Sequence, residues 1–249
     1  MARPRRLSKA PITEAVFDFR VTLPADFATE TLSGVYGQLN DRYPIKEEMR
    51  SFEAIFEVKA GKAMTPLTHS DSSAFAGFLF KSADGRNIAQ FRRDGFTFNR
   101  LAPYTNWDEL EPEALRLWSV YLASAKPDVV DRVALRYINR LRLPPQGNLE
   151  TYLLVTPPSI PGAPAVLNSF LNRQSRHDPV SGYMGNIVQN LEANLGGDNT
   201  LLTVDIDVYK AGGLGMHAAD LRRVLGDLRR LKNDIFFGMV TDTALEPYD

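Results

Sequence analysis

The residues of this chain that are best suited to chemistry are arginines on one predicted strand. Apolar and polar residues alternate from Asp131 to Leu143, which is the period of a strand with one buried face. Residues on one face of a strand lie about 7 Å apart, a spacing similar to that of phosphates along a nucleic acid. We therefore expect the charged face of this strand to bind an anionic partner. Its arginines are Arg132, Arg136, Arg140 and Arg142.

Charged residues on two other predicted strands offer these arginines a different role. The strands expected at residues 14–23 and 200–210 each combine an apolar face with a face that carries aspartates. If they neighbour the arginine strand, each arginine–aspartate pair contributes about 0.2–1 kcal/mol. The charged face is then either a solvated ion-pair network or a surface that binds an anion, a nucleotide or RNA. The residues concerned are Asp18, Arg20, Asp205 and Asp207.

A metal-dependent enzyme is the alternative interpretation of the same residues. Triphosphate-tunnel enzymes carry an ExExK strand and Arg-rich strands inside a barrel, whereas residues 53–59 read ExxxExK because Ile55 takes the middle position. In this alternative, carboxylates would hold Mg²⁺ and arginines would clamp phosphates. The protein would then be a phosphoester or triphosphate hydrolase or transferase. The metal ligands would be Glu53, Glu57, Asp205 and Asp207.

A second basic cluster lies on a helix predicted at residues 216–232. Its apolar stripe includes Leu221 and Leu228, and Arg222 and Arg223 lie away from that stripe. An exposed basic helix either docks on nucleic acid or a protein partner, or is simply a solvated face. The preceding segment, residues 212–215, is rich in glycine but lacks the phosphate-loop pattern, so we interpret it as a flexible turn.

The sequence lacks the residues of several standard catalytic centres. It contains no cysteine, which excludes disulfides, thiolate nucleophiles and cysteine-based metal sites. Its three histidines, His69, His177 and His217, are far apart in the sequence, and no GxSxG nucleophile elbow occurs. We therefore expect no cofactor and favour a non-enzymatic protein.

Composition places the chain among globular proteins. Of its 249 residues, 44% are hydrophobic and 24% are charged, and the formal net charge is −1. No apolar run approaches the ~20 residues that span a bilayer. The basic residues at the start of the chain lead into no apolar segment, so no secretion signal is predicted. We expect a cytoplasmic protein that does not bind membranes.

The predicted elements place the charged residues in an α+β fold. Hairpin turns such as Asp94-Gly95 dominate and no regular βαβ alternation occurs, so we expect a mainly antiparallel sheet with helices packed on one face. The predicted order is β-α-β-β-β-β-α-β, then β-β-β-α. We divide the chain into a basic N-terminal arm at 1–9, an α+β part at 10–143, a proline-rich connection at 144–164, and a smaller α+β part at 165–249 that could share the same sheet.

The boundaries of these elements follow from periodicity and from capping residues. Asp26 is the expected N-cap of the first helix, and Asn106 with Glu109 is the expected cap pair of the second. Because Pro112 interrupts the early part of this second helix, its regular part is predicted to start at Glu111. The expected strands are 14–23, 52–59, 75–81, 87–93, 96–101, 130–143, 166–173, 185–195 and 200–210, and the expected helices are 26–40, 107–125 and 216–232.

Four segments resemble one known family. They are APITEAVFDFR at residues 10–20, IAQFRRDGFTFNRLAPYTNW at 88–107, DRVALRYINRL at 131–141 and KNDIFFGMVTD at 232–242. Together they resemble a sporadically distributed, conserved prokaryotic protein family of about this length that has no assigned function. The resemblance implies a bacterial or archaeal protein, and the patchy distribution implies an association with defence or mobile-element genes. It transfers no catalytic residue.

The sequence thus favours a non-enzymatic binding or interaction module. We expect it to engage a protein partner or nucleic acid through the charged sheet face and the basic helix. A further possibility is a homo-oligomer formed through the aromatic pair Phe236-Phe237, which is expected in a tail that follows the last helix.

Overall fold

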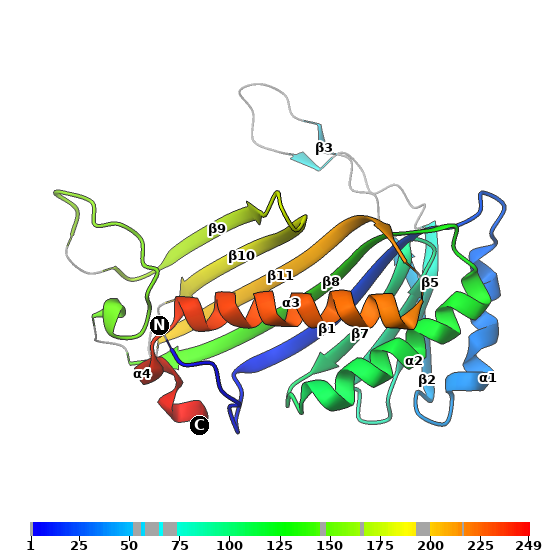
Figure 1. The fold of residues 1–249 in the computed structure, drawn as a ribbon, viewed down its shortest axis with the longest axis horizontal. Coiled ribbons are helices and arrows are strands. Elements are labelled where there is room, and N and C mark those ends of the chain that lie inside the picture. The colour runs from blue at the N-terminus through cyan, green and yellow to red at the C-terminus, as the bar shows by residue number, and fades with distance from the viewer. Residues whose placement is uncertain are drawn as a thin grey trace.

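A nine-stranded antiparallel sheet forms the frame of the molecule (Figure 1). The structure is a computed structural model, and it describes residues 2–249 except 52–55, 58–64, 67–73, 145–147, 165–166, 193–199 and 216. The strands of the sheet are β1 (Ile12–Thr22), β2 (Ile45–Ser51), β5 (Ala74–Lys81), β6 (Asn87–Arg92), β7 (Gly95–Leu101), β8 (Val129–Leu143), β9 (Phe170–His177), β10 (Tyr183–Glu192) and β11 (Thr200–Leu214).

The sheet has the order β2-β5-β6-β7-β1-β8-β11-β10-β9, so strands from both sides of the proline-rich connection belong to one sheet. A separate pair is formed by β3 (Phe56–Glu57) and β4 (Thr65–Pro66). The α+β class and the antiparallel sheet are confirmed. The α-helices are α1 (Tyr36–Leu39), α2 (Trp107–Ala125), α3 (Ala218–Met239) and α4 (Asp242–Leu245), and the 3₁₀ helices are η1 (Thr29–Val35), η2 (Leu149–Thr151) and η3 (Glu246–Tyr248).

An aromatic core fills the space between the sheet and α2. The alternation predicted for β1 is confirmed, because Phe17 and Phe19 are fully buried on the face towards the helices. Phe19 lies opposite Phe96 on β7 and stacks on Trp118 of α2, with ring centroids 4.7 Å apart. Gly95 allows this close packing, because a Cβ atom there would lie 2.0 Å from the Phe19 carbonyl oxygen.

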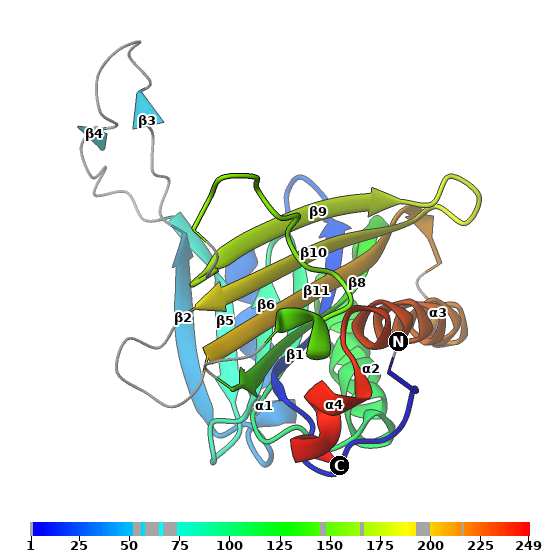
Figure 2. The same ribbon diagram turned by 90° about the vertical axis from the view of Figure 1, so that its left-hand side faces the viewer.

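The long helices α2 and α3 lie on the same side of the sheet in both views (Figure 1 and Figure 2). Helix α3 runs across β8 and β11 and buries Leu221, Leu225 and Leu228 against them. The predicted packing of helices on one face of the sheet is therefore confirmed for these two helices. Of the helices in the described part of the chain, none is long and apolar enough to cross a membrane.

Helix boundaries differ from the prediction in three places. Residues 26–40 form η1 and the single turn α1 in place of one helix, and Ala28 takes the N-cap position expected of Asp26. Gly34 and Gly37 lie inside this segment, and glycine lowers α-helix propensity. Helix α2 begins at Trp107 in spite of Pro112, because the Asn106 side chain accepts the predicted hydrogen bond from the Glu109 backbone N–H.

The third difference concerns the last helix, which continues beyond Lys232 to Met239. Apolar side chains continue at a spacing of three and four residues through Ile235 and Met239. This spacing favours a helix that extends to Met239. Phe236 and Phe237 are therefore part of α3, and they are 7% and 6% exposed. The expectation of an aromatic tail available for oligomerisation was wrong, because both rings pack into the protein's own core.

Several strand boundaries also differ. Strand β2 at Ile45–Ser51 was not predicted, and the strand expected at 52–59 lies outside the described residues except for Phe56–Glu57. Strand β9 begins four residues later than the expected start at 166, at Phe170. Strand β11 extends to Leu214, into the segment 212–215 that was interpreted as a flexible turn, and the register with β8 shifts between Ala211 and Leu214.

The N-terminal arm is fixed to the C-terminal end of the chain, and both ends lie close together (Figure 2). The Arg5 guanidinium donates to Asp249 at 2.7 and 2.9 Å and to Asp242 at 2.5 Å. The Ala2 amide donates to the Phe237 and Val240 carbonyls, at the end of α3. The basic charge of this arm is therefore used in part for an internal ion-pair cluster.

Candidate functional site

The arginines predicted to bind an anion form ion pairs within the sheet. Arg132 donates both Nη2 hydrogen bonds to the Asp207 carboxylate, at 2.8 and 2.9 Å, and donates from Nη1 to Asp18 at 2.9 Å. Arg136 makes a two-bond contact with Asp205, at 2.6 and 2.9 Å. The three strands are neighbours, because β8 lies between β1 and β11. The arginine–aspartate pairs thus connect three adjacent strands.

Asp18 is the centre of this ion-pair network. Its carboxylate accepts hydrogen bonds from Arg20, Arg92, Arg132 and the Thr97 hydroxyl. Burial raises the pKa of the Asp18 carboxyl, but these cationic and hydroxyl partners outweigh burial, and the net shift is downward. Asp18 is therefore ionised at neutral pH and neutralised by its neighbours, which is the arrangement of a structural network.

The remaining predicted arginines lie in two separate places, β8 and α3. Arg140 and Arg142 are exposed near the end of β8, and neither makes an ion pair with a described residue. Arg222 donates to Glu111 of α2 at 2.8 Å. Arg222 and Arg223 belong to α3, which covers the face of the sheet opposite to the ion-pair network. The structure therefore does not assemble the predicted arginines into one site.

The described residues do not form the predicted metal site. Asp205 and Asp207 face Arg136 and Arg132, so their oxygens already accept hydrogen bonds from guanidinium groups. Glu53 and the side chain of Glu57 lie outside the described residues. In the described part of the chain, no three histidine, aspartate or glutamate residues are grouped as metal ligands would be.

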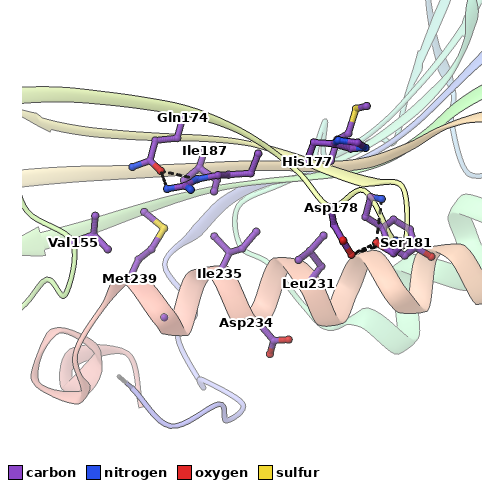
Figure 3. A pocket seen from close by; sticks show the side chains of 15 residues that line it. Val155, Gln174, His177, Asp178, Ser181, Ile187, Leu231, Asp234, Ile235 and Met239 are labelled. Atoms are coloured by element: carbon purple, nitrogen blue, oxygen red, sulfur yellow. Dashed lines mark hydrogen bonds between the residues drawn. The ribbon is translucent and has the colours of Figure 1, made fainter.

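Two cavities lie beside α3, and the larger one is mostly apolar. It has a volume of about 590 Å³ between α3 and the strands β9 and β10 (Figure 3). Leu231, Ile235 and Met239 line it from the helix. Among its polar side chains, Arg176 donates to Gln174 and the Ser181 hydroxyl donates to Asp178. His177 and Asp234 also line this cavity, and both residues are exposed.

The second cavity has a volume of about 310 Å³, and its lining includes Tyr137, whose buried hydroxyl has no hydrogen-bond partner of acceptable geometry among the described residues. Four parts of the chain meet around it: the N-terminal arm with the start of β1, the start of α2, the middle of β8, and the last turns of α3. We call it the lysine cavity. The polar and aromatic residues that line it include Arg5, Arg6, Tyr104, Asn106, Trp107, Asp108, Tyr137, Asn139, Arg229, Lys232 and Asn233.

Lys232 of α3 is the most unusual group in the lysine cavity. Its side chain is partly buried and lines the cavity. Its Nζ atom lies 3.8 Å from the centroid of the Tyr137 ring, and no described carboxylate lies within ion-pair distance. Burial, with repulsion from Arg229, lowers the pKa of Lys232 to about 7. The amine is thus partly neutral near physiological pH.

Tyr137 supplies a second unsatisfied group. Its residue is 1% exposed, and among the described residues its hydroxyl finds no hydrogen-bond partner of acceptable geometry. The Tyr104 ring packs against its edge with centroids 5.8 Å apart. Burial, with Tyr104 nearby, raises the pKa of Tyr137 well above its usual value, so the phenol remains a hydrogen-bond donor. An unpaired donor of this kind is unfavourable unless a ligand or water accepts from it.

Cationic groups outnumber anionic ones around the lysine cavity. Arg229 lies over the Trp107 ring, with its Cζ 5.0 Å from the ring centroid. Arg6 also lines the cavity, and Asp108 is the one carboxylate among the described lining residues. Asn106 and Trp107 are at the N-terminus of α2, a helix of 19 residues, whose dipole also favours an anion. This set of groups suits a small anion better than a metal ion.

Sequence reasoning missed this cavity, although two of its residues lie on elements that were correctly predicted. Tyr137 is on the apolar face of β8, where it resembles an ordinary core residue, and Lys232 looks like the polar end of an amphipathic helix. The available signal is the register of the apolar stripe, because Lys232 lies four residues after Leu228 and therefore on the buried side of α3.

Comparisons with known proteins identify no relatives that assign a role to these residues. No protein-family model matches the chain, and no curated protein matches it.

Proposed function

We propose that this chain is a binding protein whose ligand is a small anionic molecule held in the lysine cavity. The observation that carries the proposal is the Lys232 amine, which lies inside a cavity against Tyr137 with no carboxylate partner among the described residues. Burying a cationic group without a partner is costly, and an anionic ligand would remove that cost. Arg229 and the N-terminus of α2 also favour a negatively charged ligand.

Cavity size limits the class of ligand. A volume of about 310 Å³ is at the small end of ligand sites. At about 30 Å³ per water molecule in the liquid, it holds a molecule of roughly ten non-hydrogen atoms. A small carboxylate or phosphate is of this size, whereas a nucleic-acid strand or a folded partner is not. The Trp107, Tyr104 and Tyr137 rings offer apolar contact for a short carbon skeleton.

Isothermal titration calorimetry with inorganic phosphate and with succinate tests this proposal. We expect one of these anions to bind with one site per chain, and Lys232→Met and Arg229→Met to weaken binding about tenfold or more, because each removes a charged hydrogen-bond donor. Arg222→Met is the matched control on the same helix, since Arg222 pairs with Glu111 outside the cavity and should leave affinity unchanged. If neither anion binds, or if Lys232→Met binds as well as the unaltered chain, the proposal is wrong.

A further inference from the structure

The Lys232 amine has a feature that anion binding alone does not require. It lines an open cavity, and no described group accepts a hydrogen bond from it. A lysine that only holds an anion works best when it is fully protonated, whereas a buried amine with a neutral fraction is a nucleophile. A neutral primary amine reacts readily with an aldehyde or a ketone.

We propose that Lys232 captures the carbonyl group of a small 2-oxo acid as an imine, and this inference rests on the lysine cavity being the ligand site. The ligand would carry both a carbonyl carbon, for the amine, and a carboxylate, for the cationic lining. Arg229 is one turn or less from Lys232 on α3 and lines the same cavity, so it is placed to pair with that carboxylate.

The reaction is a balanced condensation. The Lys232 nitrogen lone pair forms a bond to the carbonyl carbon, and the oxygen leaves as water together with the two hydrogens of the neutral amine. The C=O bond is replaced by a C=N bond, and no oxidant or reductant takes part.

The charges around the amine keep both of its forms populated near neutral pH. On α3, Arg229 repels the ammonium form, and burial disfavours it further. On β8, the Tyr137 ring face attracts the ammonium form. The other titratable groups that line the cavity are Arg5 and Arg6 of the arm, Tyr104 before α2, and Asp108 of α2. The capture step should therefore become faster as the pH rises through about 7, the pKa of Lys232.

Borohydride trapping with pyruvate tests the proposal on the full chain. Borohydride reduces an imine to a stable secondary amine, so one adduct should add the mass of pyruvic acid less one oxygen atom. We expect one adduct per chain, and peptide mapping should place it at Lys232 rather than at any of the other seven lysines of the sequence. Adducts distributed over several lysines, or none at Lys232, would overturn the inference.

Two variants give the matched controls. Lys232→Arg keeps the positive charge but removes the nucleophilic amine, so we expect trapping at least about tenfold lower. Lys210 is the control lysine, since its amine also lies over a tyrosine ring, 5.0 Å from the Tyr183 centroid, but outside the lysine cavity. Lys210→Arg should trap like the unaltered chain.

The outcomes separate this inference from the proposed function. If succinate binds to the unaltered chain but pyruvate forms no adduct at Lys232, the cavity is an anion site and the imine proposal is wrong. If neither succinate nor phosphate binds and no adduct forms, both proposals are wrong. If trapping at Lys232 occurs with the same rate at about pH 6 and about pH 8, the amine is not the group whose deprotonation limits capture.

Discussion

At the scale of single residues, Lys232 is notable because it lines a cavity and because burying its ammonium form is energetically unfavourable. A buried ammonium group without a carboxylate partner is unfavourable, and the protein reduces the cost by lowering the pKa of the group. The folded-state pKa of about 7 lies below the ordinary value of 10.5, so the unfolded chain binds more protons between these two values. The free energy of unfolding must therefore increase with pH across this window.

Lys232→Met should remove this pH dependence. For the unaltered chain, we expect the free energy of unfolding to increase by about 2 kcal/mol from about pH 6 to about pH 9, after allowing for the partial solvent contact of the side chain. The methionine variant should be the more stable protein at pH 6 and should show a flatter profile. Urea denaturation followed by circular dichroism at several pH values measures both effects.

Lys81→Met is the control for this experiment. The Lys81 amine pairs with Glu47 at 2.8 Å on the surface of the sheet, so its loss should leave the slope between pH 6 and 9 as in the unaltered chain. An equal slope in Lys232→Met and in the unaltered chain would contradict the interpretation of Lys232 as a destabilising buried amine.

At the scale of elements, β8 carries two different kinds of contact on its two faces. Arg132 and Arg136 pair with aspartates of β1 and β11, while Leu135 and Tyr137 face the helical layer. The ion-pair network therefore fixes the register of three strands, and the same register places Tyr137 under Lys232. Removing a member of the network should therefore lower the free energy of unfolding of the protein.

Asp18→Asn tests the structural role of the network. The substitution removes a negative charge that neutralises Arg92, whose side chain is 12% exposed, so we expect the free energy of unfolding to fall by about 3 kcal/mol at neutral pH. Because the folded-state pKa of Asp18 is lowered, its stabilisation is present above the ordinary value of 3.8 and is lost as the pH falls below it. The difference between variant and unaltered chain should therefore shrink in acid.

Chemical denaturation at pH 7 and at about pH 3 measures this difference. Asp131→Asn is the control, because Asp131 is exposed and accepts one hydrogen bond, from the Thr22 hydroxyl. It should cost much less stability than Asp18→Asn. Equal losses in the two variants would contradict a special role for Asp18.

Elements with strong hydrophobic periodicity could be predicted from the sequence. Boundaries and sites that depend on tertiary packing could not. The alternation in β1 and β8 and the cap formed by Asn106 and Glu109 are local signals, and the structure has all three. The start of β9 depends on what the segment packs against, so it was misplaced. The end of α3 was misplaced although the spacing of its apolar residues continues to Met239. The lysine cavity could not be predicted, because Tyr137 and Lys232 meet only through the crossing of α3 over β8.

At the scale of the whole molecule, the two ends of the chain are joined by ion pairs beside the lysine cavity. Arg5 contacts Asp242 at the start of α4 and Asp249 at the last residue. The arm also supplies one wall of the cavity, since residues from Pro4 to Leu7 line it. The ion pairs of Arg5 therefore also hold one wall of the lysine cavity in place.

Arg5→Ala should loosen the arm without unfolding the sheet. We expect faster amide hydrogen exchange at Ala2 and Lys9, whose N–H groups donate to carbonyls near the C-terminal end, and through α4. Exchange in β1 and β8 should not change. Arg3→Ala is the matched control, because the hydrogen bond of Arg3 to Asp242 comes from its backbone. Unchanged exchange at Ala2 and Lys9 in Arg5→Ala would show that the ion pairs do not hold the arm.

The two tryptophans of the chain lie in different environments, so their fluorescence reports on different parts of the molecule. Trp118 is 1% exposed and stacks on Phe19 and Tyr121, and among the described residues its indole N–H has no acceptor. Its fluorescence emission should be blue-shifted and should change only when the core opens. Trp107 lies in the wall of the lysine cavity beneath Arg229, so its emission should respond to any ligand that moves that guanidinium. Core integrity and cavity occupancy thus have separate intrinsic fluorophores.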